Sequence, residues 1–233
     1  MENLCLPMVE CFQTVEGEGK MAGTPTTFVR VYNCNLRCRW CDTPYSYAPE
    51  HPSYFSSIGE ILEQVKSFGH GSVCLTGGEP LMHGEKSLAL VKELSLLPEV
   101  WDVHVETNGS IPLHEFIDLR SQDEKIGKTL RFIVDYKLPS SGEEDQMDSS
   151  TFSLLQAQDE GKFVVANDDD FHRALEVIKN NSIQADLLFS PVWDTMPPHH
   201  LVELLLAHRP HGGRARLNLQ LHKMIWDPDM RGV

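Results

Sequence analysis

Short apolar stretches alternate with amphipathic stretches along most of the chain. The apolar stretches are rich in β-branched and aromatic residues, which is typical of buried strands. They predict strands at 26–33, 72–78, 100–109, 129–139, 161–166 and 185–192. The amphipathic stretches have apolar residues at helical spacing and predict helices at 57–69, 85–97, 112–120, 169–181 and 198–209. The first helix should begin at Ser57 and end at Gly69, and the helix at 169–181 should be capped by aspartate.

Repeated strand–helix units predict a parallel sheet with crossover helices, and therefore an α/β fold. The six predicted parallel strands are too few for a closed barrel of eight strands, which takes about 250 residues. We therefore expect an incomplete (β/α) barrel. Residues 1–233 contain no long linker and no repeat other than this alternation, so the chain is predicted to form a single domain.

The composition is that of a globular protein with a sizeable core, since 41% of the 233 residues are hydrophobic and 23% are charged. No apolar run approaches the ~18 residues of a membrane span. The N-terminal segment lacks the basic and apolar regions of a secretion signal. A formal net charge of −14 argues against binding to nucleic acid or to an anionic membrane. We expect a soluble protein of the cytoplasm.

Residues that could carry chemistry follow directly after the predicted strands. The carboxyl ends of parallel strands form one face of an α/β fold, and functional sites are built there. We therefore expect five separate segments to line a single site. These segments are 34–41, 76–80, 106–109, 137–142 and 190–192.

Three cysteines, Cys34, Cys38 and Cys41, lie within eight residues after the first of these strands. In a reducing compartment, clustered thiols are metal ligands or catalysts more often than disulfides. A structural zinc site requires a fourth ligand, and Cys74 lies inside an apolar strand, while a disulfide would leave one thiol unpaired. An iron–sulfur cluster held by three thiolates would leave one iron open to another ligand. Zinc and a disulfide remain the alternatives at this stage.

The C-x3-C-x2-C spacing, with an aromatic residue before the third cysteine, resembles the signature of radical S-adenosylmethionine enzymes. The resemblance implies a 4Fe–4S cluster in the loop after the first barrel strand, with S-adenosylmethionine bound at its open iron. The segments "TGGEP" (76–80), "ETNG" (106–109), "DYKLPSSG" (135–142) and "FSPV" (189–192) resemble the parts of that superfamily's cofactor pocket. The cofactor-binding residues implied by the resemblance are Trp40, Asp42, Gly78, Glu79, Lys137, Ser140, Ser190 and Pro191.

Within that superfamily, the stretch "CFQTVEGEGKMAGTPTTFVRVYNCNLRCRWCDTPY" (11–45) resembles the 7-carboxy-7-deazaguanine synthase family. The family pattern is Gln-Gly-Glu-Gly, then Gly-x-Pro, then Phe-x-Arg, then the cysteines followed by Asp-Thr. The C-terminal "LNLQLHK" (217–223) resembles the family's Gln-x-His-Lys stretch. The chain departs from the pattern at Glu16, where many members carry Gln, and the substitution adds a negative charge at this position.

This resemblance implies a lyase that converts 6-carboxy-5,6,7,8-tetrahydropterin to 7-carboxy-7-deazaguanine with loss of ammonia. That reaction belongs to the biosynthesis of queuosine, a modified nucleoside of tRNA. The resemblance also implies Mg2+ bound at Thr43, a homodimer, and an electron donor such as a flavodoxin or a ferredoxin. Arg30 is expected to bind the substrate carboxylate, because a guanidinium presents two parallel N–H donors to it. The substrate-binding residues implied are Val15, Glu16, Gly17, Glu18, Arg30, Thr76 and His222.

Two other interpretations remain open from the sequence. A glycyl-radical-activating enzyme has the same cysteine loop and a similar size, although "EGEG" (16–19), Asp42-Thr43 and "QLHK" (220–223) favour the pterin enzyme. A metal-binding adaptor would use the cysteines only structurally. That interpretation leaves "TGGEP" and Arg30 without a role.

Overall fold

The computed structural model describes residues 4–148, 150–228 and 230–233. Within them, one sheet has the strand order β3-β1-β2-β4-β5-β6-β7-β8-β9. Its strands are β1 (Cys5–Val15), β2 (Pro25–Val31), β3 (Tyr54–Ser57), β4 (Ser72–Gly77), β5 (Asp102–Thr107), β6 (Leu130–Tyr136), β7 (Glu160–Val165), β8 (Asp186–Pro191) and β9 (Arg216–Leu217).

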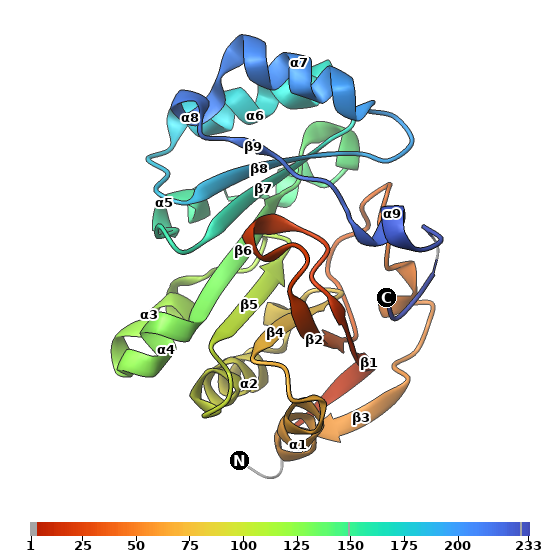
Figure 1. Ribbon diagram of the computed structural model, residues 1–233, viewed down its shortest axis with the longest axis vertical. Helices are drawn as coiled ribbons and strands as arrows, with labels where there is room; N and C mark the ends of the chain where they lie inside the picture. The colour runs from red at the N-terminus through yellow and green to blue at the C-terminus, as the bar shows by residue number, and fades with distance from the viewer. Residues whose placement is uncertain (1–3, 149, 229) are drawn as a thin grey trace.

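Every neighbouring pair from β2 to β9 is parallel, whereas β1 is antiparallel to both β2 and β3. The sheet curves but does not close, because β3 and β9 form its two edges among the described residues (Figure 1). The six predicted strands are β2 and β4 to β8, so the prediction of an incomplete (β/α) barrel is confirmed. The short strand β9 was not predicted, and it adds a seventh parallel strand beside β8.

Most of the helices lie along the outer side of the curved sheet, whereas α9 lies apart from them near the C-terminus (Figure 1). The helices are α1 (Ile58–Phe68), α2 (Glu85–Leu96), α3 (His114–Gln122), α4 (Glu124–Thr129), α5 (Thr151–Leu154), α6 (Asp168–Asn180), α7 (Pro198–His208), α8 (Pro210–Gly213) and α9 (His222–Ile225). Single 3-10 turns occur at η1 (Gly19–Met21), η2 (Pro44–Ser46), η3 (Pro80–His83), η4 (Pro139–Ser141) and η5 (Glu144–Gln146). No helix in the described part of the chain is long and apolar enough to cross a membrane.

The structure confirms the predicted ends of α1 but not the predicted cap of α6. Ser57 and Glu60 form a capping box at the start of α1, and Gly69 ends it with a φ of 73°, as predicted. The predicted aspartate cap of α6 is wrong. Asn167 is the cap and accepts from the Asp170 backbone N at 2.9 Å, while the aspartates occupy the first turn, where they complement the helix dipole.

The two faces of the sheet differ in polarity because side chains alternate along each strand. On β5, Val103 and Val105 belong to the apolar core, whereas Asp102, His104 and Glu106 project from the opposite face. The same alternation on the other parallel strands gives an apolar layer under the helices and a concave face with many charged groups. This concave face carries the candidate site.

Candidate active site

The cysteine loop follows β2. Cys34, Cys38 and Cys41 are free thiols and are partly exposed. The Cys34 Sγ accepts from the Leu36 backbone N at 3.4 Å. Burial raises the pKa of Cys34, and it raises the pKa of Cys38 to about 11. Both thiols are therefore protonated in the free protein, and binding to iron must release their protons.

At least two of the three loop sulfurs lie farther apart than the ligands of a single zinc ion do. Sulfurs bound to one zinc ion lie about 3.8 Å apart, because a Zn–S bond is ~2.3 Å long and the site is tetrahedral. Within the described residues, the three sulfurs do not form a group whose ligand atoms all lie within 4.8 Å. Cys74, the fourth cysteine considered from the sequence, lies in β4 beside His104 and Glu16 instead. The donor set therefore fits a cluster with three thiolate ligands.

The "TGGEP" segment packs tightly against the cysteine loop. A Cβ at Gly78 would lie 2.0 Å from the Asn33 carbonyl oxygen, so only glycine fits there. The Glu79 backbone N donates to the same oxygen at 2.7 Å. This packing joins the end of β4 to the start of the cysteine loop.

The Glu79 carboxylate is fully buried and accepts three hydrogen bonds from its own chain. The donors are the Leu81 N at 2.9 Å, the Thr107 Oγ1 at 2.9 Å and the Asn108 N at 2.7 Å. Burial raises the Glu79 pKa to about 7. Glu79 thus connects "TGGEP" to "ETNG", and binding of a cofactor ammonium by this carboxylate remains a prediction.

Lys137 and Asp135 bring the end of β6 next to the cysteine loop. The Lys137 Nζ lies 2.7 Å from the Asp135 Oδ2. Burial alone would lower the Lys137 pKa, but the charge of Asp135 and its hydrogen bond to Lys137 keep it above its usual value. The Asp135 Oδ1 is buried and has no hydrogen-bond partner among the described residues. It is an available acceptor, which fits a bound group with hydroxyl or ammonium donors.

The other predicted cofactor residues have different surroundings. The Ser140 N donates to the Asp170 Oδ1 at 3.0 Å, and the neighbouring Ser141 carbonyl accepts from the Arg39 N of the cysteine loop at 3.1 Å. The Ser190 hydroxyl accepts from Asn218 at 2.8 Å, so it contacts the C-terminal segment. Trp40 and Pro191 are partly exposed and Asp42 is exposed. The Thr43 Oγ1 lies 3.8 Å from the Cys41 Sγ, which places this hydroxyl at the cysteine loop.

The turn that carries "EGEG" enters the site from the opposite end of the sheet. Because β1 is antiparallel to β2, the turn after Val15 lies at the amino ends of the parallel strands. Residues 16–18 therefore lie at the end of the sheet opposite to the five segments that follow the parallel strands. The Gly17 carbonyl accepts from the Leu221 N at 3.0 Å, and a Cβ at Gly17 would lie 2.7 Å from the His222 Nδ1. The structure thus brings the two family-like stretches at the chain ends together.

Glu18 is the most strongly bound carboxylate of this turn. It accepts from the Lys162 Nζ at 3.1 Å, the Asn218 Nδ2 at 2.9 Å and the Gln220 Nε2 at 2.7 Å. Burial alone would raise its pKa, but the charge of Lys162 and these hydrogen bonds lower it to about 2. Glu18 is therefore ionised throughout the physiological range.

Arg30 and Thr76 are neighbours on adjacent strands, β2 and β4. The Arg30 Nε donates to the Glu10 Oε1 at 2.9 Å, and the Tyr45 hydroxyl lies 3.3 Å from the same oxygen. No acceptor among the described residues bonds either Nη of Arg30, so these donors are available for a ligand. The Thr76 Oγ1 donates to the Glu106 Oε2 at 3.0 Å.

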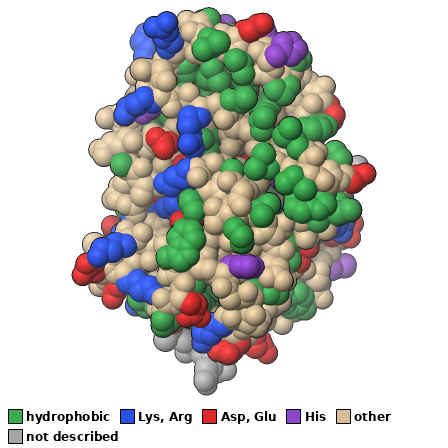
Figure 2. All heavy atoms as spheres, viewed as in Figure 1, with side chains coloured by type: hydrophobic (Ala, Val, Ile, Leu, Met, Phe, Trp, Pro, Cys, Tyr) green, Lys and Arg blue, Asp and Glu red, His purple; other side chains and the backbone are tan. Residues whose placement is uncertain are grey.

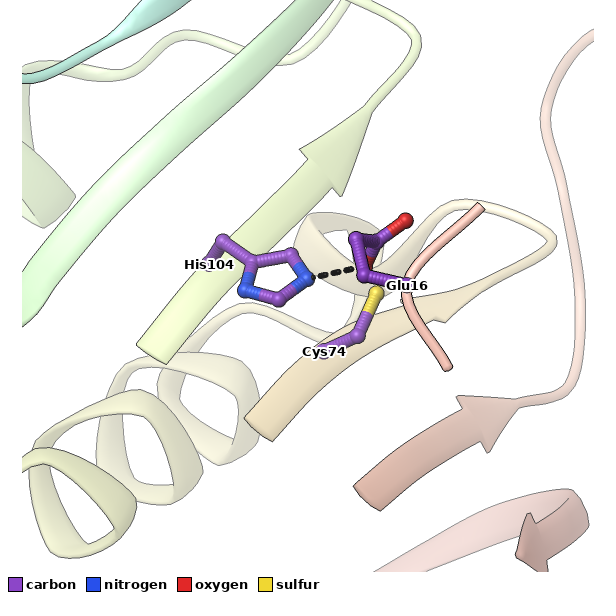
Figure 3. Close-up of side chains that lie close together, drawn as sticks. All are labelled: Glu16, Cys74 and His104. Atoms are coloured by element: carbon purple, nitrogen blue, oxygen red, sulfur yellow. Dashed lines mark hydrogen bonds and ion pairs between the residues drawn. The ribbon is translucent and has the colours of Figure 1, made fainter. Parts of the chain in front are cut away.

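Several residues of the site were not found from the sequence. The largest group surrounds Glu16, whose Oε2 lies 2.6 Å from the Nε2 of His104, with Cys74 beside them (Figure 3). The alternation "DVHVET" at 102–107 was the available signal, because it places polar residues on one face of a strand that is apolar on the other. Lys162 follows the same rule on β7.

The chain is similar to known proteins over most of its length. Residues 28–125 match the model of the Radical SAM superfamily. The chain is 33% identical over 228 residues to the 7-carboxy-7-deazaguanine synthase of Clostridium acetobutylicum. The aligned region covers 97% of this chain and 98% of the relative. It is 34% identical over 252 residues to the synthase of Leptospira interrogans, over the full length of both proteins.

A solved structure shares the fold. The crystal structure of QueE from Escherichia coli superposes with a TM-score of 0.69 over 93% of this chain and 94% of that chain, at 22% identity. The sequence relatives are similar enough, over enough of their length, to establish membership. The chain therefore belongs to the 7-carboxy-7-deazaguanine synthase family of the radical S-adenosylmethionine superfamily.

Proposed function

We propose that this chain, as a single domain, converts 6-carboxy-5,6,7,8-tetrahydropterin to 7-carboxy-7-deazaguanine with loss of ammonia. The observation that carries the proposal is the Arg30 guanidinium, which leaves both Nη groups available on the concave face that the cysteine loop borders. A fork of two N–H donors matches a carboxylate, which this substrate bears. Relatives that match over their full length and are named 7-carboxy-7-deazaguanine synthase support this reaction.

Cys34, Cys38 and Cys41 would hold the 4Fe–4S cluster, which together with S-adenosylmethionine supplies the radical that abstracts hydrogen from the substrate. The buried Asp135 Oδ1, which lacks a donor among the described residues, would accept from the cofactor. Lys137 holds that carboxylate in place through its other oxygen. The remaining cofactor contacts would come from the residues named in the sequence analysis.

The substrate would be oriented by groups at both ends of the concave face. Arg30 binds its carboxylate, and Glu18, which stays ionised, accepts from its amino and ring N–H groups. The Thr43 hydroxyl would bind Mg2+, an ion that prefers oxygen ligands and retains water. His222 and Gly17 would close the site, because the C-terminal segment packs against the turn at residues 16–18.

We also propose an external electron donor such as a flavodoxin or ferredoxin, because the cluster must be reduced for each cleavage of the cofactor. A homodimer is supported by exposed apolar side chains on the side of the molecule that carries α9 (Figure 2). Trp193, Met224 and Ile225 are each more than half exposed. Light scattering with a Met224→Glu variant tests this assembly, and a wild-type monomer would contradict it.

The two other interpretations are less well supported. The full-length relatives are named as synthases, so activation of a glycyl-radical enzyme is not favoured. A structural zinc adaptor would not need an Arg30 with available donors or an acceptor at Asp135.

The proposal is tested by reconstituting the protein anaerobically with iron and sulfide. It is then assayed with S-adenosylmethionine, Mg2+, a reductant and 6-carboxytetrahydropterin, and the products are identified by mass spectrometry. We expect a brown protein that forms 7-carboxy-7-deazaguanine. A brown protein that releases only 5′-deoxyadenosine would contradict the substrate, and a colourless zinc protein would contradict the cluster.

A further inference from the structure

His104 is fully buried between two carboxylates. Its Nε2 lies 2.6 Å from the Glu16 Oε2 and its Nδ1 lies 2.7 Å from the Asp102 Oδ2. A carboxylate only accepts hydrogen bonds, so each ring nitrogen must donate, and only the imidazolium can donate from both. Figure 3 shows the first of these contacts, with the ring of His104 directed at Glu16.

The interaction continues across three strands. The Asp102 Oδ1 accepts from the Arg131 Nε at 2.6 Å, and the Arg131 Nη1 donates to the Glu160 Oε2 at 2.8 Å. The result is a series of alternating charges, which we call the ion-pair chain. It consists of Glu16, His104, Asp102, Arg131 and Glu160.

Both ends of the ion-pair chain hold the same turn. At one end, Glu16 belongs to the turn, and at the other, the Glu160 Oε1 accepts from the Lys20 backbone N at 2.8 Å. The turn at residues 16–20 is therefore fixed to β5 and β7 through buried charges. A buried charge that loses its partner destabilises the fold. Removal of any one residue of the ion-pair chain should therefore leave its neighbours unpaired and loosen the turn.

Glu16 connects the ion-pair chain to Glu18, the carboxylate proposed to bind the substrate. Its second oxygen, Oε1, accepts from the Glu18 backbone N at 3.1 Å. Glu18 then extends its side chain to Lys162 on β7. His104 is thus linked to the Glu18 backbone through Glu16.

We propose that the His104 imidazolium is a positioning residue for substrate binding, and that Glu16 and His104 act as one charge-compensated unit. This inference rests on the proposed function. It also accounts for the departure from the family pattern at position 16, because the proton on His104 balances the charge that Glu16 adds. Loss of that proton would leave two buried carboxylates facing a neutral ring, and the turn would no longer be held in place.

The groups around His104 determine when its proton is lost. Glu16 faces it from the turn, Asp102 and Glu106 come from β5, Cys74 comes from β4, and Arg131 from β6 reaches it through Asp102. Burial alone would lower the His104 pKa, but the adjacent Cys74 sulfur, the charge of Glu16 and the hydrogen bond to Asp102 hold it well above its usual value. Burial also raises the Cys74 pKa to about 12, so this thiol stays neutral. Substrate binding should therefore weaken only at alkaline pH.

A double-mutant cycle tests the pairing. His104→Ala leaves Glu16 buried and unpaired, so we expect KM for the pterin to rise more than 20-fold. Glu16→Gln keeps a neutral hydrogen bond and should raise KM less than fivefold. The double variant should bind the pterin better than His104→Ala alone, because the unpaired charge is gone. Equal KM values for His104→Ala and the double variant would overturn the proposal.

A surface residue supplies the matched control. His200 also lies between two carboxylates, at 2.7 Å from Asp168 and 3.4 Å from Glu203, but it is exposed. His200→Gln should leave KM and its pH profile unchanged. In contrast, the rise of KM at alkaline pH should shift to lower pH in Glu16→Gln, where one carboxylate no longer holds the proton. An unshifted profile in Glu16→Gln would also overturn the proposal.

A measurement without substrate keeps the inference separate from the proposed function. In protein labelled with 15N-histidine, the His104 signals, assigned with His104→Gln, should show both ring nitrogens protonated at pH 7.5. A neutral tautomer at that pH would overturn the proposal even if the enzyme is active. Retention of zinc by a variant lacking the three loop cysteines, lost on His104→Ala, would also overturn it. In that case Glu16, Cys74 and His104 would hold a metal rather than a proton.

Discussion

Arg30 and Glu10 form an ion pair in which the guanidinium uses only its Nε, at 2.9 Å from the carboxylate. Glu10 thus orients the side chain, while neither Nη group is bonded by an acceptor in the described part of the chain. Arg30→Lys cannot present two parallel donors, and losing a charged hydrogen bond costs about 1.5–3 kcal/mol, which corresponds to a factor of about 10 to 160. We expect KM for the pterin to rise by that factor in steady-state kinetics.

Two controls accompany this variant. Iron content and the uncoupled cleavage of S-adenosylmethionine should stay at wild-type levels, because Arg30 is not a predicted cluster ligand. Glu10→Gln keeps an acceptor for the Nε and should raise KM less than Arg30→Lys does. A wild-type KM for Arg30→Lys would show that the carboxylate binds elsewhere.

Cys38→Ala should lose the cluster and all activity together, because two thiolates do not hold a cluster with one open iron. The measurement is iron content and the visible absorption of the reconstituted protein. Cys5→Ser is the control, since Cys5 is an exposed cysteine in β1 outside the loop. If Cys38→Ala retained full iron content, Cys38 would not be a ligand.

The strands and the main helices were predictable because each carries its own local pattern. Alternation and apolar runs located β2 and β4 to β8, and the Ser57 and Gly69 signals set both ends of α1. The two-residue strand β9 has no such pattern, and it forms only because β8 offers an open edge. Its existence depends on tertiary contacts.

Only those residues of the candidate site that belong to a sequence motif could be predicted. The cysteine loop and Arg30 could be named, but Lys162 and Asn218 lie 144 and 200 residues from Glu18, which they bind. No local signal pairs groups at such separations. For the same reason the partner of Glu16 was missed, although "DVHVET" already indicated a polar face on β5.

Gly78→Ala should disrupt the cysteine loop. Its Cβ would lie 2.0 Å from the Asn33 carbonyl oxygen, which is backbone and cannot turn aside. We expect a loss of stability of at least the 1–3 kcal/mol of an overpacked core, and poor cluster incorporation. Both are measured by thermal unfolding and iron content.

The matched control is Gly59→Ala in α1, where an added Cβ has nothing within 4 Å. Alanine is favoured over glycine in a helix by about 0.5–1 kcal/mol, so this variant should be slightly more stable than the wild type. Equal stability of Gly78→Ala and Gly59→Ala would contradict the close approach at Gly78.

Glu18 should make the fold sensitive to acid. Its pKa is about 2 in the folded protein against 4.5 ordinarily, mainly because the charge of Lys162 outweighs the effect of burial. A lowered carboxyl pKa stabilises the fold above pH 4.5, and this contribution is lost as the pH falls towards 2. At 1.36 kcal/mol per pKa unit, the contribution is on the order of 3 kcal/mol.

Urea unfolding between pH 3 and pH 7 measures this contribution. Glu18→Gln has no group to titrate, so its unfolding free energy should fall less than that of the wild type on acidification. Glu63→Gln is the control. The Glu63–Lys66 ion pair, at 2.8 Å, is shorter than the Glu18–Lys162 pair, at 3.1 Å, but it lies on the surface, where solvent screens it. We expect Glu63→Gln to follow the wild-type curve. If Glu18→Gln also followed that curve, the ionised Glu18 would not stabilise the turn, and its carboxylate would be held for the substrate alone.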